Sequence, residues 1–277
     1  MPPANHALPP LPNRPFDLCA ASSFAAEARR TLSVFGAPVE LVWLPRRKAR
    51  AGAPRADRPP FQPDRASQIL ATESVWSGHG CALTPNRWPL GDREVLLWAT
   101  EPVREWPLAL LEVALALEER DRVTVLGNTI GAAASIPRAH LHLIDGELPF
   151  LAELAREPWT ADAAQGIEDV ELSRLAPPFP VLAVGLRGPA AARARATHTL
   201  IRRRLCASFN IISQNGETWL VPRRGPEIPA PHFPFALGAA ELWGRWCYGD
   251  RAPFDAATGA ALEGAVRESG FPLDGAP

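Results

Sequence analysis

Little in the sequence marks a secreted, zinc-binding or membrane-spanning protein. Its 4 cysteines are widely spaced, and without a Cys-x-x-Cys pair nothing indicates a zinc knuckle or a redox motif. No apolar run is long enough to cross a bilayer, and the amino-terminal residues combine no basic region with an apolar core. We therefore expect a reduced, cytoplasmic protein whose cysteines are free, buried thiols.

An excess of charge of either sign is also absent. The 29 basic and 30 acidic residues nearly cancel, and Lys48 is the single lysine. This balance gives no indication of binding to nucleic acid or to a membrane. The 277 residues, 47% of them hydrophobic, are enough to bury one large domain or two modest ones. The 31 prolines predict long connecting segments, and the proline-rich residues 1–20 are expected to be disordered.

The chain does contain one unusual stretch, residues 128–144, whose last seven residues alternate with a period of two. Read as a strand, it places Arg138, His140 and His142 on one face. Upstream, Gly131 and Ser135 belong to a loop of small residues that leaves room for a ligand. This combination suits phosphate chemistry, because concentrated cations are costly in a core without an anionic partner. A structural histidine pair and part of a metal site remain alternative interpretations.

Residues 135–144 resemble two related signatures. One is the histidine-triad signature, His-φ-His-φ-His-φ-φ, with Arg138 standing where the first histidine belongs. The other is the Ser-x-Pro-His-x-His-x-Gln segment of the galactose-1-phosphate uridylyltransferase and diadenosine tetraphosphate phosphorylase branch. In both patterns the middle histidine is the nucleophile, and it maps onto His140. The last polar position is His142, as in the triad hydrolases, rather than glutamine.

Two further segments fit the same branch. The turn Asn86-Arg87-Trp88-Pro89 resembles its Asn-x-Phe/Tyr-Pro element, which implies that Asn86 helps to hold a nucleotide. An asparagine before a proline-containing turn is also common for turn chemistry alone. In the second half, residues 209–212, 221–223 and 236–240 follow the order found in the carboxy-terminal part of the phosphorylases. The resemblance is closest over roughly residues 60–145.

Periodicity and turn signals predict the following elements. Helices are expected at residues 22–34, 106–120, 190–206 and 256–269, with a short one within 145–164. Strands are expected at residues 39–44, 68–75, 80–83, 94–100, 122–127, 138–144, 209–214 and 217–223, with two more within 166–186. Asn215-Gly216 predicts a type I′ hairpin turn. For the basic residues of 45–65, which include Lys48, and of 190–206, a solvated surface is the alternative to phosphate binding.

The resemblance implies an α+β fold made of two histidine-triad-like halves, with antiparallel sheets flanked by helices. After the segment 1–20 we expect a catalytic half over residues 21–150. A carboxy-terminal half follows over residues 165–277. The boundary is expected between residues 145 and 166, and only the first half is expected to hold chemistry.

The function implied is that of a nucleotidylyltransferase or phosphorylase acting on a dinucleoside polyphosphate or nucleotide-sugar. His140 forms a covalent nucleotidyl intermediate, His142 protonates the departing oxygen, and phosphate or a sugar phosphate is the acceptor. Arg138, about 6.5–7 Å along the strand from His140, is expected to grip a phosphate oxygen bidentately. The full set of expected substrate-binding residues is Asn86, Arg87, Asn128, Gly131, Ser135, Arg138, Lys48 and Arg223.

We expect no cofactor and no metal other than Mg²⁺ on the substrate's phosphates. His79, Cys81, His140 and His142 show no characteristic structural-zinc spacing. Two alternatives remain open from the sequence. One is a triad-type hydrolase, which His142 in place of glutamine favours. The other is a catalytically degenerate nucleotide-binding protein, which Arg138 favours. The sequence leaves the oligomeric state undetermined.

Overall fold

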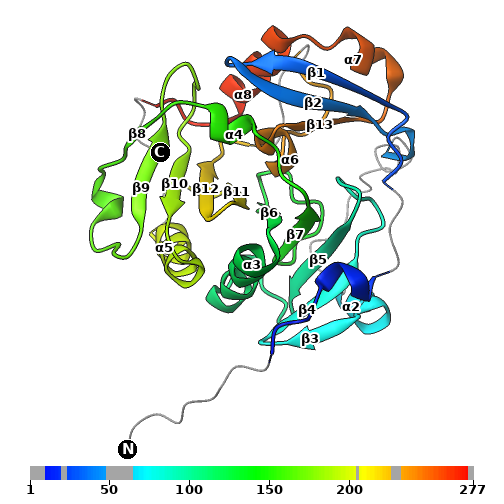
Figure 1. The fold of residues 1–277 in the computed structure, drawn as a ribbon, viewed down its shortest axis with the longest axis vertical. Coiled ribbons are helices and arrows are strands. Elements are labelled where there is room, and N and C mark those ends of the chain that lie inside the picture. The colour runs from blue at the N-terminus through cyan, green and yellow to red at the C-terminus, as the bar shows by residue number, and fades with distance from the viewer. Residues whose placement is uncertain (1–9, 20–23, 48–64, 204–205, 226–231, 274–277) are drawn as a thin grey trace, which may run out of the picture.

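The computed structural model describes residues 10–19, 24–47, 65–203, 206–225 and 232–273. Its centre is a 10-stranded sheet, and a 3-stranded sheet lies against it. Helices α3 (Leu108–Asp121) and α5 (Ala190–Arg202) cover one face of the large sheet, with the small sheet on the opposite side (Figure 1). The expected α+β class is therefore confirmed.

Every neighbouring pair of strands in the large sheet is antiparallel, in the order β3-β4-β5-β7-β6-β11-β12-β10-β9-β8. The strands of its first half are β3 (Trp76–Gly78), β4 (Cys81–Pro85), β5 (Glu94–Ala99), β6 (Val123–Asn128) and β7 (His140–Asp145). Those of its second half are β8 (Arg156–Pro158), β9 (Glu171–Leu175), β10 (Val184–Arg187), β11 (Phe209–Gln214) and β12 (Glu217–Pro222).

The two halves repeat one topology. Each consists of three strands, a long helix and two strands, and from either outer edge inwards the sequence order is first, second, third, fifth, fourth. They meet where β6 pairs with β11, with Asn128 opposite Asn210. The last strand of the first half ends at Asp145 and the first strand of the second begins at Arg156. The halves thus form one continuous sheet.

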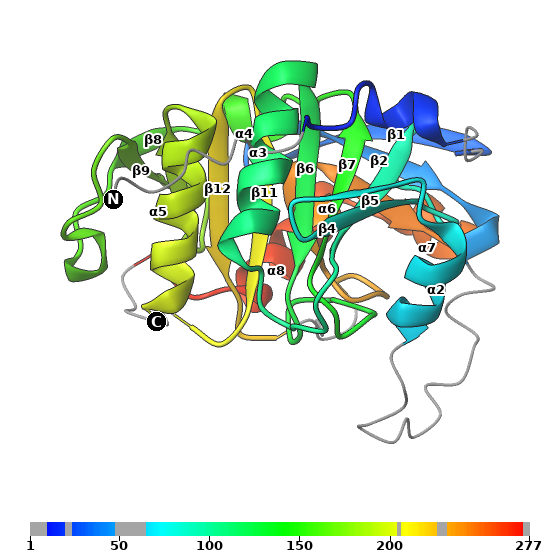
Figure 2. The same cartoon turned by 90° about the horizontal axis from the view of Figure 1, so that it is seen from below.

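Alternation along the strands divides the core into two layers. Leu141 and Leu143 of β7 face α3 and α5, together with Leu220 of β12. Ile144, by contrast, packs on the opposite face with the small sheet. Figure 2 shows both helices lying across the large sheet. Because side chains alternate between faces, His140 and His142 share the face of Ile144, away from α3 and α5.

The small sheet joins the two ends of the chain. β1 (Ala28–Val34) pairs antiparallel with β2 (Ala37–Trp43), which pairs in parallel with β13 (Arg245–Tyr248). The remaining elements are α2 (Arg65–Glu73), α4 (Phe150–Glu153), α6 (Ala239–Trp243), α7 (Arg251–Ala256), α8 (Gly259–Ser269), η1 (Pro15–Leu18), η2 (Pro45–Arg47) and η3 (Asp162–Ala164). A strand from each end thus shares one sheet, so the small sheet belongs to neither half alone.

Two predicted elements have the wrong type. Residues 28–34 of the expected helix at 22–34 form strand β1, because Phe35 and Gly36 take positive φ values of 52° and 85° and close a tight hairpin onto β2. Residues 22–23 lie outside the described residues. The expected strand at 68–75 belongs mostly to helix α2, whose sequence is built of good helix formers and buries Ala66. The expected hairpin around Asn215-Gly216 is confirmed, with positive φ at both residues.

Candidate active site

His140 is the first residue of β7 and is 6% exposed. Its Nδ1 lies 2.7 Å from the carbonyl oxygen of Arg138. Since a carbonyl only accepts, Nδ1 carries the proton and the lone pair is on Nε2. The ring stacks on Trp98, which is paired with His140 on the neighbouring strand β5, at 4.6 Å between ring centroids and 27° between ring planes. Trp98 is itself held, because its Nε1 donates to Thr84 Oγ1 at 2.9 Å.

His142 follows on the same face, with its ring centroid 5.6 Å from that of His140. Its Nδ1 lies 2.5 Å from Oε1 of Glu94, whose side chain is 0% exposed against 16% for His142. The amide Nδ2 of Asn86 donates to the same oxygen at 2.6 Å, and the backbone N–H of Leu90 donates to the other one. Asn86, Glu94 and His142 therefore form a hydrogen-bonded chain.

Glu94 was not among the residues expected from the sequence. The available signal was that Glu94 places a carboxylate at the start of a strongly apolar strand. By alternation Glu94 shares one face of that strand with Leu96 and Trp98. Leu96 pairs with His142, and Trp98 pairs with His140. Only this register shows that the carboxylate reaches an imidazole.

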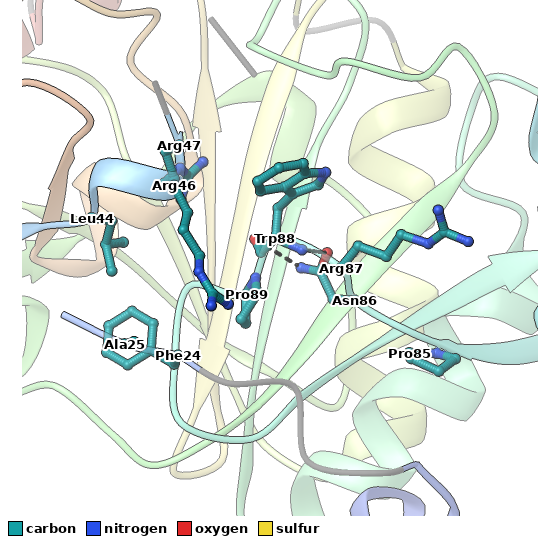
Figure 3. Close-up of a pocket in the computed structure, with 10 residues that line it drawn as sticks. All are labelled: Phe24, Ala25, Leu44, Arg46, Arg47, Pro85, Asn86, Arg87, Trp88 and Pro89. Carbon is teal, nitrogen blue, oxygen red and sulfur yellow. Dashed lines mark hydrogen bonds between the residues drawn. The ribbon is translucent and has the colours of Figure 1, made fainter. Parts of the chain in front are cut away.

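Asn86 and Arg87 lie in the turn that borders a pocket of about 360 Å³ (Figure 3). Asn86 holds the turn, since its Oδ1 accepts from the backbone N–H of Trp88 at 3.0 Å. The side chain of Arg87 extends away from the other side chains of the pocket and is 74% exposed. It pairs with Glu73 at 2.7 Å, and so the structure does not bring it to His140.

The opposite wall of the pocket carries two arginines from η2 (Figure 3). Nη1 of Arg47 is buried and has no hydrogen-bond partner among the described residues. Lys48, the expected phosphate ligand, lies outside the described residues and follows Arg46 and Arg47 directly. The complete lining is Phe24, Ala25, Leu44, Arg46, Arg47, Pro85, Asn86, Arg87, Trp88 and Pro89.

The loop from residue 129 to 139, which connects β6 with β7, is anchored by the second half of the molecule. Gly131 has a φ of +85°, and a Cβ there would lie 2.3 Å from Ser208 Oγ. That hydroxyl donates to the carbonyl of Ile130 at 2.8 Å. The backbone N–H groups of Ala132 and Ala134 both donate to the carbonyl of Thr129. Two amides of the small-residue loop are therefore used inside the turn, while Ser135 lies exposed on the loop.

Asn128 and Arg223 join elements of the protein to one another. Asn128 Oδ1 accepts from Asn210 Nδ2 at 2.6 Å and from the backbone N–H of Ala239 at 2.8 Å. Arg223 is 2% exposed. It donates to Asn210 Oδ1 and, at 2.9 Å each, to the carbonyls of Leu237 and Ser269. Burial lowers the pKa of Arg223 to about 10. The structure thus places Arg223 in the scaffold.

Arg138 differs from its expected position. β7 begins at His140, so the alternation of the strand does not extend back to Arg138. The guanidinium is buried and turned toward the end of β5, where Nε donates to the carbonyl of Ala99 at 3.0 Å and Nη2 to that of Thr100. Nη1 donates to Ser67 Oγ at 3.0 Å. Arg138 anchors the loop, and its backbone carbonyl orients His140.

The cysteines are all free, as expected, but only Cys81 and Cys247 are buried, while Cys19 and Cys206 are half-buried. Burial raises the pKa of the Cys81 and Cys247 thiols to about 12. Within the described part of the chain, no three His, Cys, Asp or Glu side chains are grouped to hold a metal ion. No helix there has the length and apolar character needed to cross a membrane.

Comparison with known proteins gives a clear answer at the level of the fold. No protein-family model matches the sequence, and no curated protein matches it significantly. Yeast Ap4A phosphorylase Apa2 in complex with AMP superposes with a TM-score of 0.65 at 16% identity, covering 90% of this chain and 89% of that one. The same enzyme in complex with Ap4A gives 0.65 at 15% identity over 92% of both chains. The chain has the Ap4A phosphorylase fold. The histidine-triad-like fold expected from residues 135–144 is thereby confirmed.

Proposed function

We propose that the protein transfers a nucleotidyl group from a dinucleoside polyphosphate or nucleotide-sugar, through a covalent intermediate on His140. The observation that carries this proposal is the hydrogen bond from Nδ1 to the Arg138 carbonyl, which leaves the lone pair on Nε2. The shared fold supports the substrate class, because the yeast enzyme was crystallised with AMP and with Ap4A. Phosphate or a sugar phosphate serves as the acceptor.

In the first step, Nε2 of His140 attacks the α-phosphorus, a P–N bond forms, and the P–O bond to the leaving group breaks. In the second step, an acceptor oxygen attacks the same phosphorus, and the P–N electrons return to Nε2. The imidazole is a competent leaving group because it departs neutral, keeping its proton on Nδ1. Trp98 beneath the ring restricts its tilt through both steps.

The pocket beside the turn 86–89 is the proposed place for the substrate's phosphates. Arg47 brings a buried Nη1 without a hydrogen-bond partner among the described residues to its wall, and a guanidinium N–H is a strong donor to phosphate oxygens. The aromatic ring of Trp88 on the opposite wall offers a surface for a nucleobase. In this proposal Mg²⁺ acts only on the phosphates, and His140 needs no metal.

The test is to trap the intermediate with Ap4A labelled on its α-phosphates. The wild-type protein, quenched in mid-reaction, should carry the label, and His140→Asn should carry none. His198→Asn on α5 is the matched control, a histidine on a helix of the second half, and it should label normally. Label retained on His140→Asn would overturn the assignment of the nucleophile. Binding of Ap4A without any label on the wild type would instead indicate a nucleotide-binding protein without turnover.

A second reaction, hydrolysis, is favoured by the contact of His142 with Glu94. Incubation of the wild type with Ap4A, with and without phosphate, separates the two reactions by product. Phosphorolysis yields a nucleoside diphosphate that depends on added phosphate, and hydrolysis yields AMP without it.

A further inference from the structure

We infer that Glu94 is a positioning residue that makes His142 the proton carrier of the reaction, and that this pair makes water a competent acceptor of the nucleotidyl group. The inference rests on the proposed function of His140. It goes further by assigning a role to Glu94 and by naming the residue pair that decides between water and phosphate.

Glu94 is built into the site as an acceptor. Its carboxylate receives hydrogen bonds from Leu90 N–H, Asn86 Nδ2 and His142 Nδ1. The orientation of the Asn86 amide is fixed, because its Oδ1 accepts from the backbone N–H of Trp88. Three donors converge on a side chain with no exposed surface, which suits the ionised carboxylate.

The consequence for His142 is a defined tautomer. With Nδ1 donating to Glu94, Nε2 is the nitrogen that takes up and releases a proton, and the carboxylate stabilises the imidazolium that forms. The ring centroids of His142 and His140 are 5.6 Å apart, so a phosphorus bound to His140 lies near His142. A carboxylate that orients a histidine in this way acts through it and does not touch the substrate.

The proton balance closes over the two steps. When His140 attacks, the imidazolium of His142 gives its Nε2 proton to the departing phosphate oxygen. Water then attacks the nucleotidyl-histidine, its oxygen bonds to phosphorus, the P–N bond breaks, and one water proton passes to Nε2 of His142. The products are AMP and the leaving nucleotide, and both histidines return to their starting states.

The two acceptors differ in what they require of residue 142. Water must lose a proton as it attacks, whereas phosphate near neutral pH already carries an anionic oxygen. A glutamine can hold a phosphate oxygen but cannot exchange a proton. Residue 142 therefore affects hydrolysis more than phosphorolysis.

The experiment measures the partition of products from Ap4A at a fixed phosphate concentration. His142→Gln should slow the first step, which both routes share, and should in addition lower the ratio of AMP to ADP by about 10²-fold, the usual contribution of a general acid or base, because only discharge by water needs a proton acceptor. Glu94→Gln should shift the ratio of ADP to AMP in the same direction by a smaller factor. Glu217→Gln is the matched control, a buried carboxylate at the start of β12, and it should leave the ratio unchanged.

The inference is wrong if both variants still label His140 and keep the wild-type product ratio, an outcome that leaves the proposed function intact. A wild type that never becomes labelled refutes the proposed function itself. Should the variants fail to fold, the solvent deuterium isotope effect on the wild type decides. Discharge of the isolated nucleotidyl-enzyme should slow in D₂O with water as acceptor and much less with phosphate. Equal effects would overturn the inference.

Discussion

The two halves of the large sheet share one topology and differ in what lies at the same place in each. In the first half, β6 and β7 are joined by residues 129–139, whereas the turn Asn215-Gly216 joins β11 and β12 in the second. The last strand of the first half begins with His140, which pairs with Trp98. The last strand of the second half begins with Glu217, which pairs with Arg187.

In the second half, the sheet face equivalent to that of His140 and His142 is buried. Trp219 lies two residues after Glu217, so its position in β12 is equivalent to that of His142 in β7. It is 1% exposed and belongs to the core that packs against the small sheet. Glu217 is tied to Arg156 at 2.5 Å. The second half instead holds the loop of the first, through Ser208 and Asn210. A repeated fold thus provides a scaffold twice, and the side chains at the start of one strand distinguish the copy that carries the proposed active site.

The largest expected effect comes from breaking the buried ion pair between the halves. Glu118 on α3 and Arg193 on α5 lie 2.6 Å apart, with side chains 1% and 0% exposed. Glu118→Ala should lower the free energy of unfolding by about 3–5 kcal/mol, because the buried guanidinium of Arg193 loses its counter-ion. Urea denaturation measures the loss. The control is Glu112→Ala, at a half-buried glutamate on the same helix, which should cost much less. A loss below about 1 kcal/mol would mean that the ion pair adds little to the strand pairing and apolar packing that join the halves.

A smaller loss of stability is expected at Arg138, which anchors the loop between β6 and β7 that the second half lacks. Arg138→Ala should cost about 2–3 kcal/mol of stability, since the buried carbonyl of Ala99 and the partly buried carbonyl of Thr100 lose charged donors. The KM for Ap4A should stay near that of the wild type, because the guanidinium is turned toward β5. A raised KM with unchanged stability would instead restore Arg138 as a phosphate ligand. Thermal unfolding and steady-state kinetics on one preparation distinguish the two outcomes.

The smallest effect concerns thiol reactivity in the two halves. The thiolate is the reactive form, and burial raises the pKa of Cys81 on β4 to about 12. Cys206, just before β11, is half-buried. At a pH of about 8, iodoacetamide should therefore modify Cys206 well before Cys81 in the native protein. Peptide mass spectrometry over time gives the order, and faster modification of Cys81 would show that the first half opens more readily.

Local sequence predicted most elements, and its two errors have different causes. Runs of strand-forming residues identified β5 and β6, alternation identified β7, and Asn215-Gly216 identified the β11–β12 hairpin. Residues 28–34 carry several polar side chains and become a strand because β2 pairs with them. Residues 65–73 are ambiguous between helix and strand as a short segment, and helix propensity prevailed.

The sequence by itself determined the histidine strand, the turn at Asn86 and the lone-pair chemistry available to an imidazole at His140, because these depend on residue type and local spacing. Only the tertiary structure decided that Glu94 contacts His142 across 48 residues and that Arg138 is turned toward Thr100, 38 residues away. The physical reason is that a side chain's role depends on its partners. Strand pairing brings those partners from distant parts of the chain, and no local pattern records them.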